Sequence, residues 1–198
     1  MDKSYWESYY TKIQKPFDSS TFAKFVLNKM TPNQTIIDLG CGNGRDSIYF
    51  SENKIRTLGV DQSSVAIKNL KPFENSYLNF EISDFSNLKK EKFDYGYCRF
   101  VLHSINEAEE ENLMNWLSKN IIKNIFIESR TNIDEKKYKK TDHYRRLMDI
   151  DKFKKLIEKN GFKIDYEKVS DKFSKYNSAY KVNDINFDPI IVRFVLSL

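Results

Sequence analysis

One stretch of the sequence decides the fold: TIIDLGCGNGRDSIYF, residues 35–50. Its apolar run predicts a buried strand, its three glycines predict a tight turn, and the residues after Gly44 predict a helix. A turn with so few side chains lets a ligand come close to the backbone. The alternative without a ligand is a plain glycine-rich turn before a helix.

The spacing within this turn excludes two common phosphate-binding motifs. A P-loop requires a Gly-Lys-Ser or Gly-Lys-Thr ending, which does not follow Gly40. A dinucleotide site requires a small residue where Arg45 stands, because a large side chain spoils the packing of the helix on the strand. What remains is the pattern Asp38-x-Gly40-x-Gly42-x-Gly44, which suits a ligand that lacks a pyrophosphate.

Strand-like and helix-like segments alternate along the chain. Helices are expected at residues 4–13, 19–30, 44–53, 63–73, 106–121 and 149–161, and strands at 34–40, 55–61, 78–85, 93–103, 122–129, 162–170 and 189–198. This order predicts an α/β fold, with a mostly parallel sheet, helices on both faces and an antiparallel edge strand. The long irregular stretch at 131–149 is typical of a lid or a binding loop.

The composition indicates a globular protein with one core. A chain of 198 residues, 40% of them hydrophobic, predicts a single domain over residues 1–198. The net charge of +5 favours an anionic ligand without requiring nucleic acid. Cys41 and Cys98 form no metal-binding pattern, and no stretch resembles a signal peptide or a membrane span. We therefore expect a cytoplasmic protein, monomeric or weakly dimeric, that does not bind membranes or metals.

Two further acids fall at the ends of predicted strands. Asp61 ends the second strand and could bind both hydroxyls of a ribose, although an acid there is also a common turn residue. Asp84 follows the third strand and could accept a hydrogen bond from an adenine amine, while Phe85 packs on the ring. The ends of parallel strands share one sheet edge. Together with the glycine turn, these residues would serve a ribose, an adenine and an amino-acid-like tail.

These motifs resemble those of a known family. IIDLGCGNGRDS, GVDQS and ISDF are similar to the first three motifs of class I S-adenosylmethionine-dependent methyltransferases, over about residues 20–198. The resemblance implies a Rossmann-like seven-stranded sheet and S-adenosyl-L-methionine as the cofactor, with S-adenosyl-L-homocysteine as its product. It implies that the cofactor-binding residues are Asp38, Gly40, Gly42, Gly44, Arg45, Asp61, Gln62, Asp84 and Phe85. For Arg45, contact with the methionine carboxylate and a place on the helix surface remain open.

The methyl acceptor is expected beyond the fourth and fifth strands. Methyl transfer from a sulfonium needs an acceptor lone pair in line, at about 3–3.5 Å, so positioning supplies most of the acceleration. The candidate catalytic residues are His103, Arg99 and Arg130, and the candidate substrate-binding residues are Tyr5, Trp6, Tyr10, Glu128, His143, Tyr144, Arg145 and Arg146. The N-terminal helices (1–30) could form a flap over the site, where Tyr5, Trp6 and Tyr10 would exclude water and face the sulfonium. Simpler interpretations are a solvated basic surface, a pairing of Arg130 with Glu128, and N-terminal helices that only dock on the core.

The gathering of arginines suits an acceptor that carries phosphate or carboxylate, because arginine binds such groups through two donors. We therefore predict a methyltransferase for a small anionic metabolite. YCRFVLHSI, FIESRT, DHYRR and DPIIVRFV are also similar to small bacterial methyltransferases of capsule or phosphonate-like pathways, and this resemblance implies a capsular polysaccharide precursor as the acceptor. The alternative is an RNA- or protein-modifying methyltransferase, or a nucleic-acid-binding protein, of the same fold. The absence of an Asn-Pro-Pro-Tyr-type motif after the fourth strand argues against nucleic acid.

Overall fold

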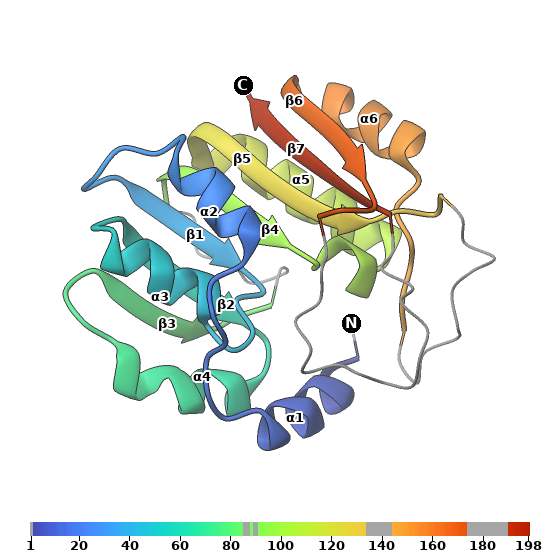
Figure 1. Ribbon diagram of the computed structural model, residues 1–198. Coiled ribbons are helices and arrows are strands. Elements are labelled where there is room, and N and C mark those ends of the chain that lie inside the picture. The colour runs from blue at the N-terminus through green and yellow to red at the C-terminus, as the bar shows by residue number, and fades with distance from the viewer. Residues whose placement is uncertain (1, 85–87, 89–90, 134–143, 174–189) are drawn as a thin grey trace.

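The computed structural model describes residues 2–84, 88, 91–133, 144–173 and 190–198. Its strands are β1 (Thr35–Leu39), β2 (Arg56–Asp61), β3 (Leu78–Ile82), β4 (Phe93–Arg99), β5 (Ile121–Arg130), β6 (Lys163–Ser170) and β7 (Ile191–Ser197). They form one seven-stranded sheet in the order β3-β2-β1-β4-β5-β7-β6 (Figure 1). The pairings are parallel from β3 to β5, while β7 runs antiparallel to both β5 and β6. The predicted fold class is confirmed, and the antiparallel pairings lie at the β6 end of the sheet.

The helices lie on both faces of this sheet. They are α1 (Lys3–Lys12), α2 (Thr21–Leu27), α3 (Arg45–Glu52), α4 (Ser64–Leu70), α5 (Glu107–Asn120) and α6 (Ile150–Lys159), with short 3-10 helices η1 (Lys71–Phe73) and η2 (Leu102–Ser104). Helices α2 and α3 contribute to the core on one face, and α5 and α6 to the core on the other. Helix α1 lies beside α4, beyond the carboxyl ends of the strands (Figure 1).

Side-chain caps explain where several helices begin. Ser20, Ser63 and Asp149 each accept a hydrogen bond from the backbone of the first turn that follows, at the starts of α2, α4 and α6. At α5, Asn106 and Glu109 form a reciprocal capping box. These caps satisfy backbone N–H groups that have no partner within their own helix.

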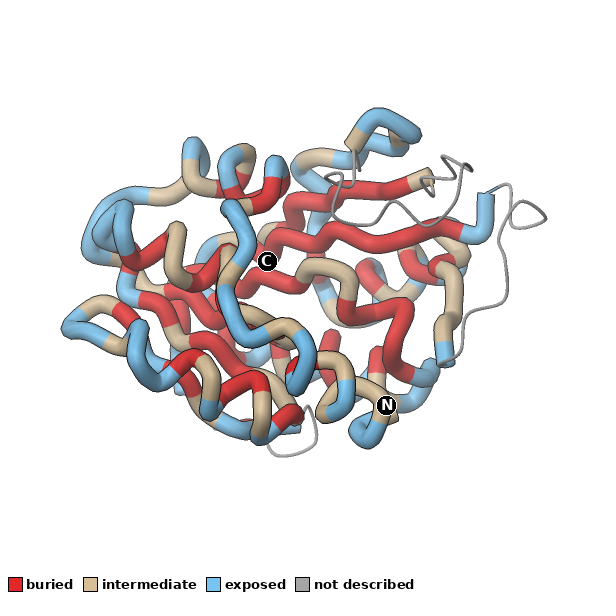
Figure 2. The backbone as a smooth tube through the Cα atoms, turned by 60° about the horizontal axis from the view of Figure 1, so that its bottom comes forward, coloured by how far each residue is buried: buried red, intermediate tan, exposed pale blue. Residues whose placement is uncertain are grey.

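The core follows the alternation of side chains along the strands. On one face, Ile36 and Phe126 pack with residues of α2 and α3, while Ile37 and Ile127 join the cluster formed with α5 and α6. The central strands are buried along most of their length, and exposed residues gather on the outer helices and loops (Figure 2). Strand β7 is buried almost throughout because it lies between β5 and β6.

Strand β4 differs from its prediction. The sequence predicts a strand over 93–103, but β4 ends at Arg99, and Phe100 takes a left-handed backbone with φ +56°. The chain then forms η2, so His103 lies on a 3-10 turn. Of the irregular stretch 131–149, the structure describes both ends, where Thr131 and Met148 form a parallel bridge. No helix among the described residues is long and apolar enough to cross a membrane.

Candidate functional site

Hydrogen bonds join the carboxyl ends of β1 and β2. The backbone N–H groups of Gly40 and Cys41 donate to the carbonyl oxygen of Val60, at 2.8 and 3.0 Å. The N–H of Gly42 donates to Oδ2 of Asp61 at 3.0 Å. The glycine turn and the acid at the tip of β2 are therefore one connected unit, as expected from the parallel strand order.

The same unit extends to the end of β3. The N–H of Ser83 donates to the carbonyl oxygen of Asp61 at 3.0 Å, which places the exposed Asp84 at the same edge. Asp61 also accepts from the N–H of Ser63 at 2.9 Å. Burial is the main cause that raises the pKa of Asp61, because a carboxylate loses hydration there. Phe85, the predicted adenine contact, lies outside the described residues.

The turn itself requires glycine. Gly40, Gly42 and Gly44 have φ values of +71°, +57° and +73°, a region that residues with a side chain rarely adopt. A Cβ atom on Gly42 would lie 2.5 Å from the hydroxyl of Tyr10. Helix α1 therefore packs directly on the bare backbone that the sequence assigns to a ligand.

Asp38 lies behind the turn, at the end of β1. It is 3% exposed and accepts a hydrogen bond from the hydroxyl of Ser47 at 2.5 Å. Burial raises its pKa to about 7; the charges of Asp46 and Asp61 add to this effect, and the Ser47 bond opposes it. Arg45 is partly buried, with Nε 3.9 Å from Oδ1 of Asp46, a position that leaves its predicted role at the cofactor untested.

Beside Asp61, the side chain of Gln62 has a buried amide nitrogen without a hydrogen-bond partner among the described residues. Buried polar atoms are normally satisfied, so an unsatisfied donor at a candidate binding site indicates a ligand or water. The carboxylate of Asp61 accepts backbone hydrogen bonds from Gly42, Ser63 and Gln62, and a carboxylate, with about four acceptor sites, has capacity for a further donor. These two neighbouring residues can therefore bind hydroxyl and acceptor groups of a nucleoside.

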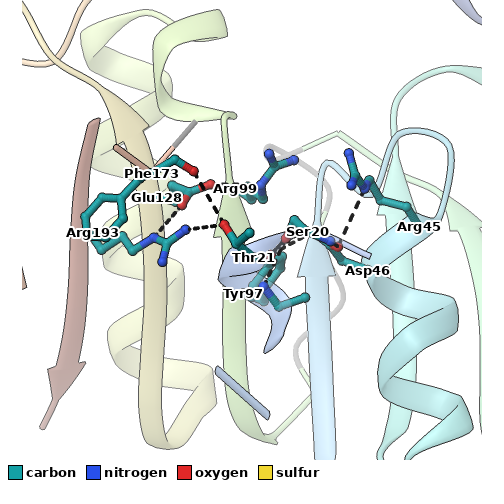
Figure 3. Close-up of polar contacts among 10 residues, drawn as sticks. Ser20, Thr21, Arg45, Asp46, Tyr97, Arg99, Glu128, Phe173 and Arg193 are labelled. Atoms are coloured by element: carbon teal, nitrogen blue, oxygen red, sulfur yellow. Dashed lines mark hydrogen bonds and ion pairs between the residues drawn. The ribbon is translucent and has the colours of Figure 1, made fainter. Parts of the chain in front are cut away.

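A second group of polar residues lies at the ends of β4 and β5. Glu128 is 2% exposed and accepts from Nε of Arg99 at 2.8 Å and from Nε of Arg193 at 2.6 Å (Figure 3). Arg193 also donates to the hydroxyl of Thr21 at 2.9 Å. Arg193 therefore has a structural role between Glu128 and Thr21, and Glu128 holds Arg99 in place.

Phe100 connects Arg99 to Arg130. The guanidinium carbons of these two arginines lie 4.4 and 4.8 Å from the centroid of the Phe100 ring. Nη1 of Arg130 is 3.1 Å from Nε2 of His103. Because arginine can only donate, Nε2 accepts this bond, and the proton of a neutral His103 ring is on Nδ1. Sequence reasoning missed Phe100, since nothing in an apolar run marks a left-handed backbone.

The segment after the undescribed residues packs against η2 and α5. Arg146 contacts Glu110 at 2.8 Å and donates to the carbonyl oxygens of Ile105 and Leu102 at 3.2 and 3.3 Å. These contacts fasten the segment and occupy the Arg146 guanidinium. The neighbouring Tyr144 is 49% exposed and Arg145 is partly buried. His143 lies outside the described residues.

The three predicted aromatic contacts lie on α1. Trp6 stacks on Tyr10 with ring centroids 6.0 Å apart, and Tyr5 meets Trp6 edge to face at 5.1 Å. Tyr10 is buried, and its carbonyl oxygen accepts from Asn69 of α4 at 3.1 Å. Sequence reasoning also missed Glu7, whose carboxylate lies between α1 and α4.

The comparisons with known proteins agree with this geometry. A family profile described as "Methyltransferase domain" matches residues 30–186. A comparison with curated proteins finds no significant match. The described residues hold no group of three or more His, Cys, Asp or Glu side chains that could bind a metal ion.

Among solved structures, an S-adenosylmethionine-dependent methyltransferase from Methanosarcina mazei is 13% identical, with a TM-score of 0.70 over 91% of this chain and 98% of that one. Magnesium protoporphyrin IX methyltransferase (ChlM) from Synechocystis, solved with S-adenosylmethionine, is 15% identical, with a TM-score of 0.67 over 97% and 79%. The [4+2]-cyclase SpnF is 12% identical, with a TM-score of 0.70 over 89% and 79%. At these identities the likeness shows the fold.

Fold and site together define a Rossmann-like protein with a glycine turn and a strand-tip acid at one sheet edge. The chain belongs to the methyltransferase domain family, because the profile covers most of its length. The prediction of S-adenosylmethionine as the cofactor is confirmed at the level of this family.

Proposed function

We propose that this protein transfers the methyl group of S-adenosylmethionine to a small acceptor that carries phosphate or carboxylate. The observation that supports the cofactor part is the hydrogen-bonded unit of Gly42, Asp61 and Ser83 across three strand ends. S-adenosylmethionine, when bound, supplies an electrophilic methyl group on a sulfonium. A capsule precursor would be one member of the proposed acceptor class.

The residues of the turn fit this cofactor. Asp61 would accept hydrogen bonds from the ribose hydroxyls, and Gln62 would donate from its unsatisfied amide to a neighbouring acceptor of the nucleoside. Asp38 to Gly44 would hold the methionine part, with Asp84 on the adenine side. The Asp38 carboxyl, with a pKa raised to about 7, would be the partner for the amino group of the methionine part.

The acceptor class is inferred from the cations beside the turn. The positive charge of Arg99 acts to lower the pKa of both Asp38 and Arg45. Figure 3 shows Arg99 with Arg45 on one side and Glu128 on the other. Glu128 provides one negative charge for the two guanidinium groups of Arg99 and Arg193. An acceptor with its own negative charge would complement this arrangement.

A binding and activity experiment tests both parts. S-adenosylhomocysteine at about 100 times its Kd should stabilise the protein by about 2.7 kcal/mol, while NAD should not stabilise it. Asp61→Asn should lose most of this stabilisation, because an amide replaces one hydroxyl-accepting oxygen with a donor. Asp165→Asn, on the edge strand β6, is the control for removing a carboxylate. Absence of stabilisation of the native protein would contradict the cofactor assignment.

The acceptor is then sought with labelled cofactor, among phosphorylated and carboxylated metabolites, neutral sugars, RNA and protein. For an anionic acceptor, Arg130→Lys should raise KM or lower turnover by about 10- to 100-fold, since a charge-assisted hydrogen bond contributes about 1.5–3 kcal/mol. Arg56→Lys, at the exposed start of β2, should have no effect. Efficient methylation of RNA, protein or a neutral sugar that is insensitive to Arg130→Lys would favour the alternative.

A further inference from the structure

The carboxylate of Glu7 on α1 accepts four hydrogen bonds from the start of α4. Oε2 of Glu7 accepts from the hydroxyl of Ser63 at 2.9 Å and from the N–H of Val65 at 3.0 Å. Oε1 accepts from both the N–H and the hydroxyl of Ser64, each at 3.0 Å. Burial would raise the pKa of Glu7, but these hydrogen bonds lower it to about 2. The ionised side chain therefore satisfies donors of the first turn of α4 that have no partner within the helix.

The same contacts lead to the cofactor turn. The N–H of Ser63 donates to Oδ1 of Asp61, and Oδ2 of Asp61 accepts from the N–H of Gly42. Gly42 in turn lies against the hydroxyl of Tyr10, which is one helical turn beyond Glu7 on α1. The contacts form a closed circuit from α1 through α4, β2 and the glycine turn, and back to α1.

We propose that Glu7 is a positioning residue for the cofactor site. It fixes the Ser63–Asp61 connection and holds Tyr10 over the glycine turn, so cofactor binding and the docking of α1 are coupled. The inference rests on the proposed function only in naming S-adenosylmethionine and its product as the ligands. Coupling of this kind is reciprocal: a cofactor that binds the docked state better also tightens α1 by the same factor.

The chain provides a fluorescent reporter for this coupling. It contains two tryptophans, of which Trp6 lies on α1 and Trp116 on α5. In a Trp116→Phe background, all tryptophan emission comes from Trp6, and acrylamide quenching measures how well α1 is docked. S-adenosylhomocysteine should reduce this quenching in the otherwise native chain.

The decisive variant in that background is Glu7→Gln, which keeps the shape and removes the charge. It should raise the Kd for S-adenosylhomocysteine about tenfold, or about 1.4 kcal/mol, and increase quenching of Trp6 without ligand. Ser64→Ala, which removes one of the four hydrogen bonds, should act in the same direction with a smaller effect. Glu52→Gln, an exposed acid at the end of α3, is the matched control and should change neither quantity.

Three results would separate the possible errors. If Glu7→Gln binds the ligand with native Kd and native quenching, the inference is wrong and the proposed function stands. If it only lowers Tm, with Kd unchanged, Glu7 is structural and the inference is again wrong. If the Trp116→Phe protein and the native chain both fail to bind S-adenosylhomocysteine, the proposed function itself is wrong. A loss of affinity that accompanies increased quenching in Glu7→Gln alone would support the coupling.

Discussion

Gly42→Ala is the substitution with the sharpest structural consequence. The added Cβ atom would lie 2.5 Å from the hydroxyl oxygen of Tyr10. The alanine would also have to adopt the φ of +57° that Gly42 has. The left-handed backbone alone costs about 1–2 kcal/mol for alanine. Gly161 separates the two effects, because it has φ +79° with nothing within 4 Å of an added Cβ. Gly161→Ala therefore reports the backbone strain without a collision.

Both variants should lose about 1 kcal/mol or more of unfolding free energy, which corresponds to a fall of about 2–4 °C in Tm for a chain of this size. Only Gly42→Ala should also displace Tyr10 and weaken S-adenosylhomocysteine. Tyr10→Phe removes the colliding oxygen, after which the nearest ring atom of residue 10 is Cζ at 3.4 Å. The alanine should therefore be better tolerated in the Tyr10→Phe background.

The assay is a double-mutant cycle on Gly42 and Tyr10, measured by urea unfolding and by ligand titration. Contacting residues commonly give interaction energies of about 0.5–3 kcal/mol, while independent sites add within about 0.3–0.5 kcal/mol. We expect a favourable interaction energy of about 1 kcal/mol between the two substitutions. Additive losses, or equal effects of Gly42→Ala and Gly161→Ala on ligand affinity, would refute the placement of α1 on the turn.

Two further predictions concern buried acids. Because the pKa of Asp38 is raised from 3.8 to about 7, the native state keeps a proton that the unfolded chain releases, so this residue lowers stability as pH rises from about 4 to 7. Urea unfolding without ligand measures the difference in unfolding free energy between Asp38→Asn and the native protein. This difference should shift in favour of the variant from pH 5 to pH 8; an equal difference at both pH values would contradict the prediction. Glu128→Gln should destabilise the protein by about 3–5 kcal/mol, because it removes the charge that two guanidinium groups share; a loss below about 1 kcal/mol in the same assay would show that those pairs contribute little.

The sequence predicted the elements whose signals are local. The alternation of strands and helices and the acids at strand ends both depend on neighbouring residues, and the structure shows each of them. The overrun of the fourth strand has a physical reason: Phe100 continues an apolar pattern that β4 had begun, and a positive φ leaves no trace in hydrophobicity. The contact of Glu7 with α4 was missed because it joins residues 56 to 58 positions apart.

The Glu128 pairs show what strand register adds to such reasoning. Arg99 is the direct neighbour of Glu128 across β4 and β5, and Arg193 is its direct neighbour across β5 and β7. Facing cross-strand positions of opposite charge attract, so a correct register would have predicted both pairs from sequence. One carboxylate between two guanidinium groups fixes the positions of both. Glu128 is therefore best understood as the residue that joins the ends of β4, β5 and β7 and holds Arg99 in place.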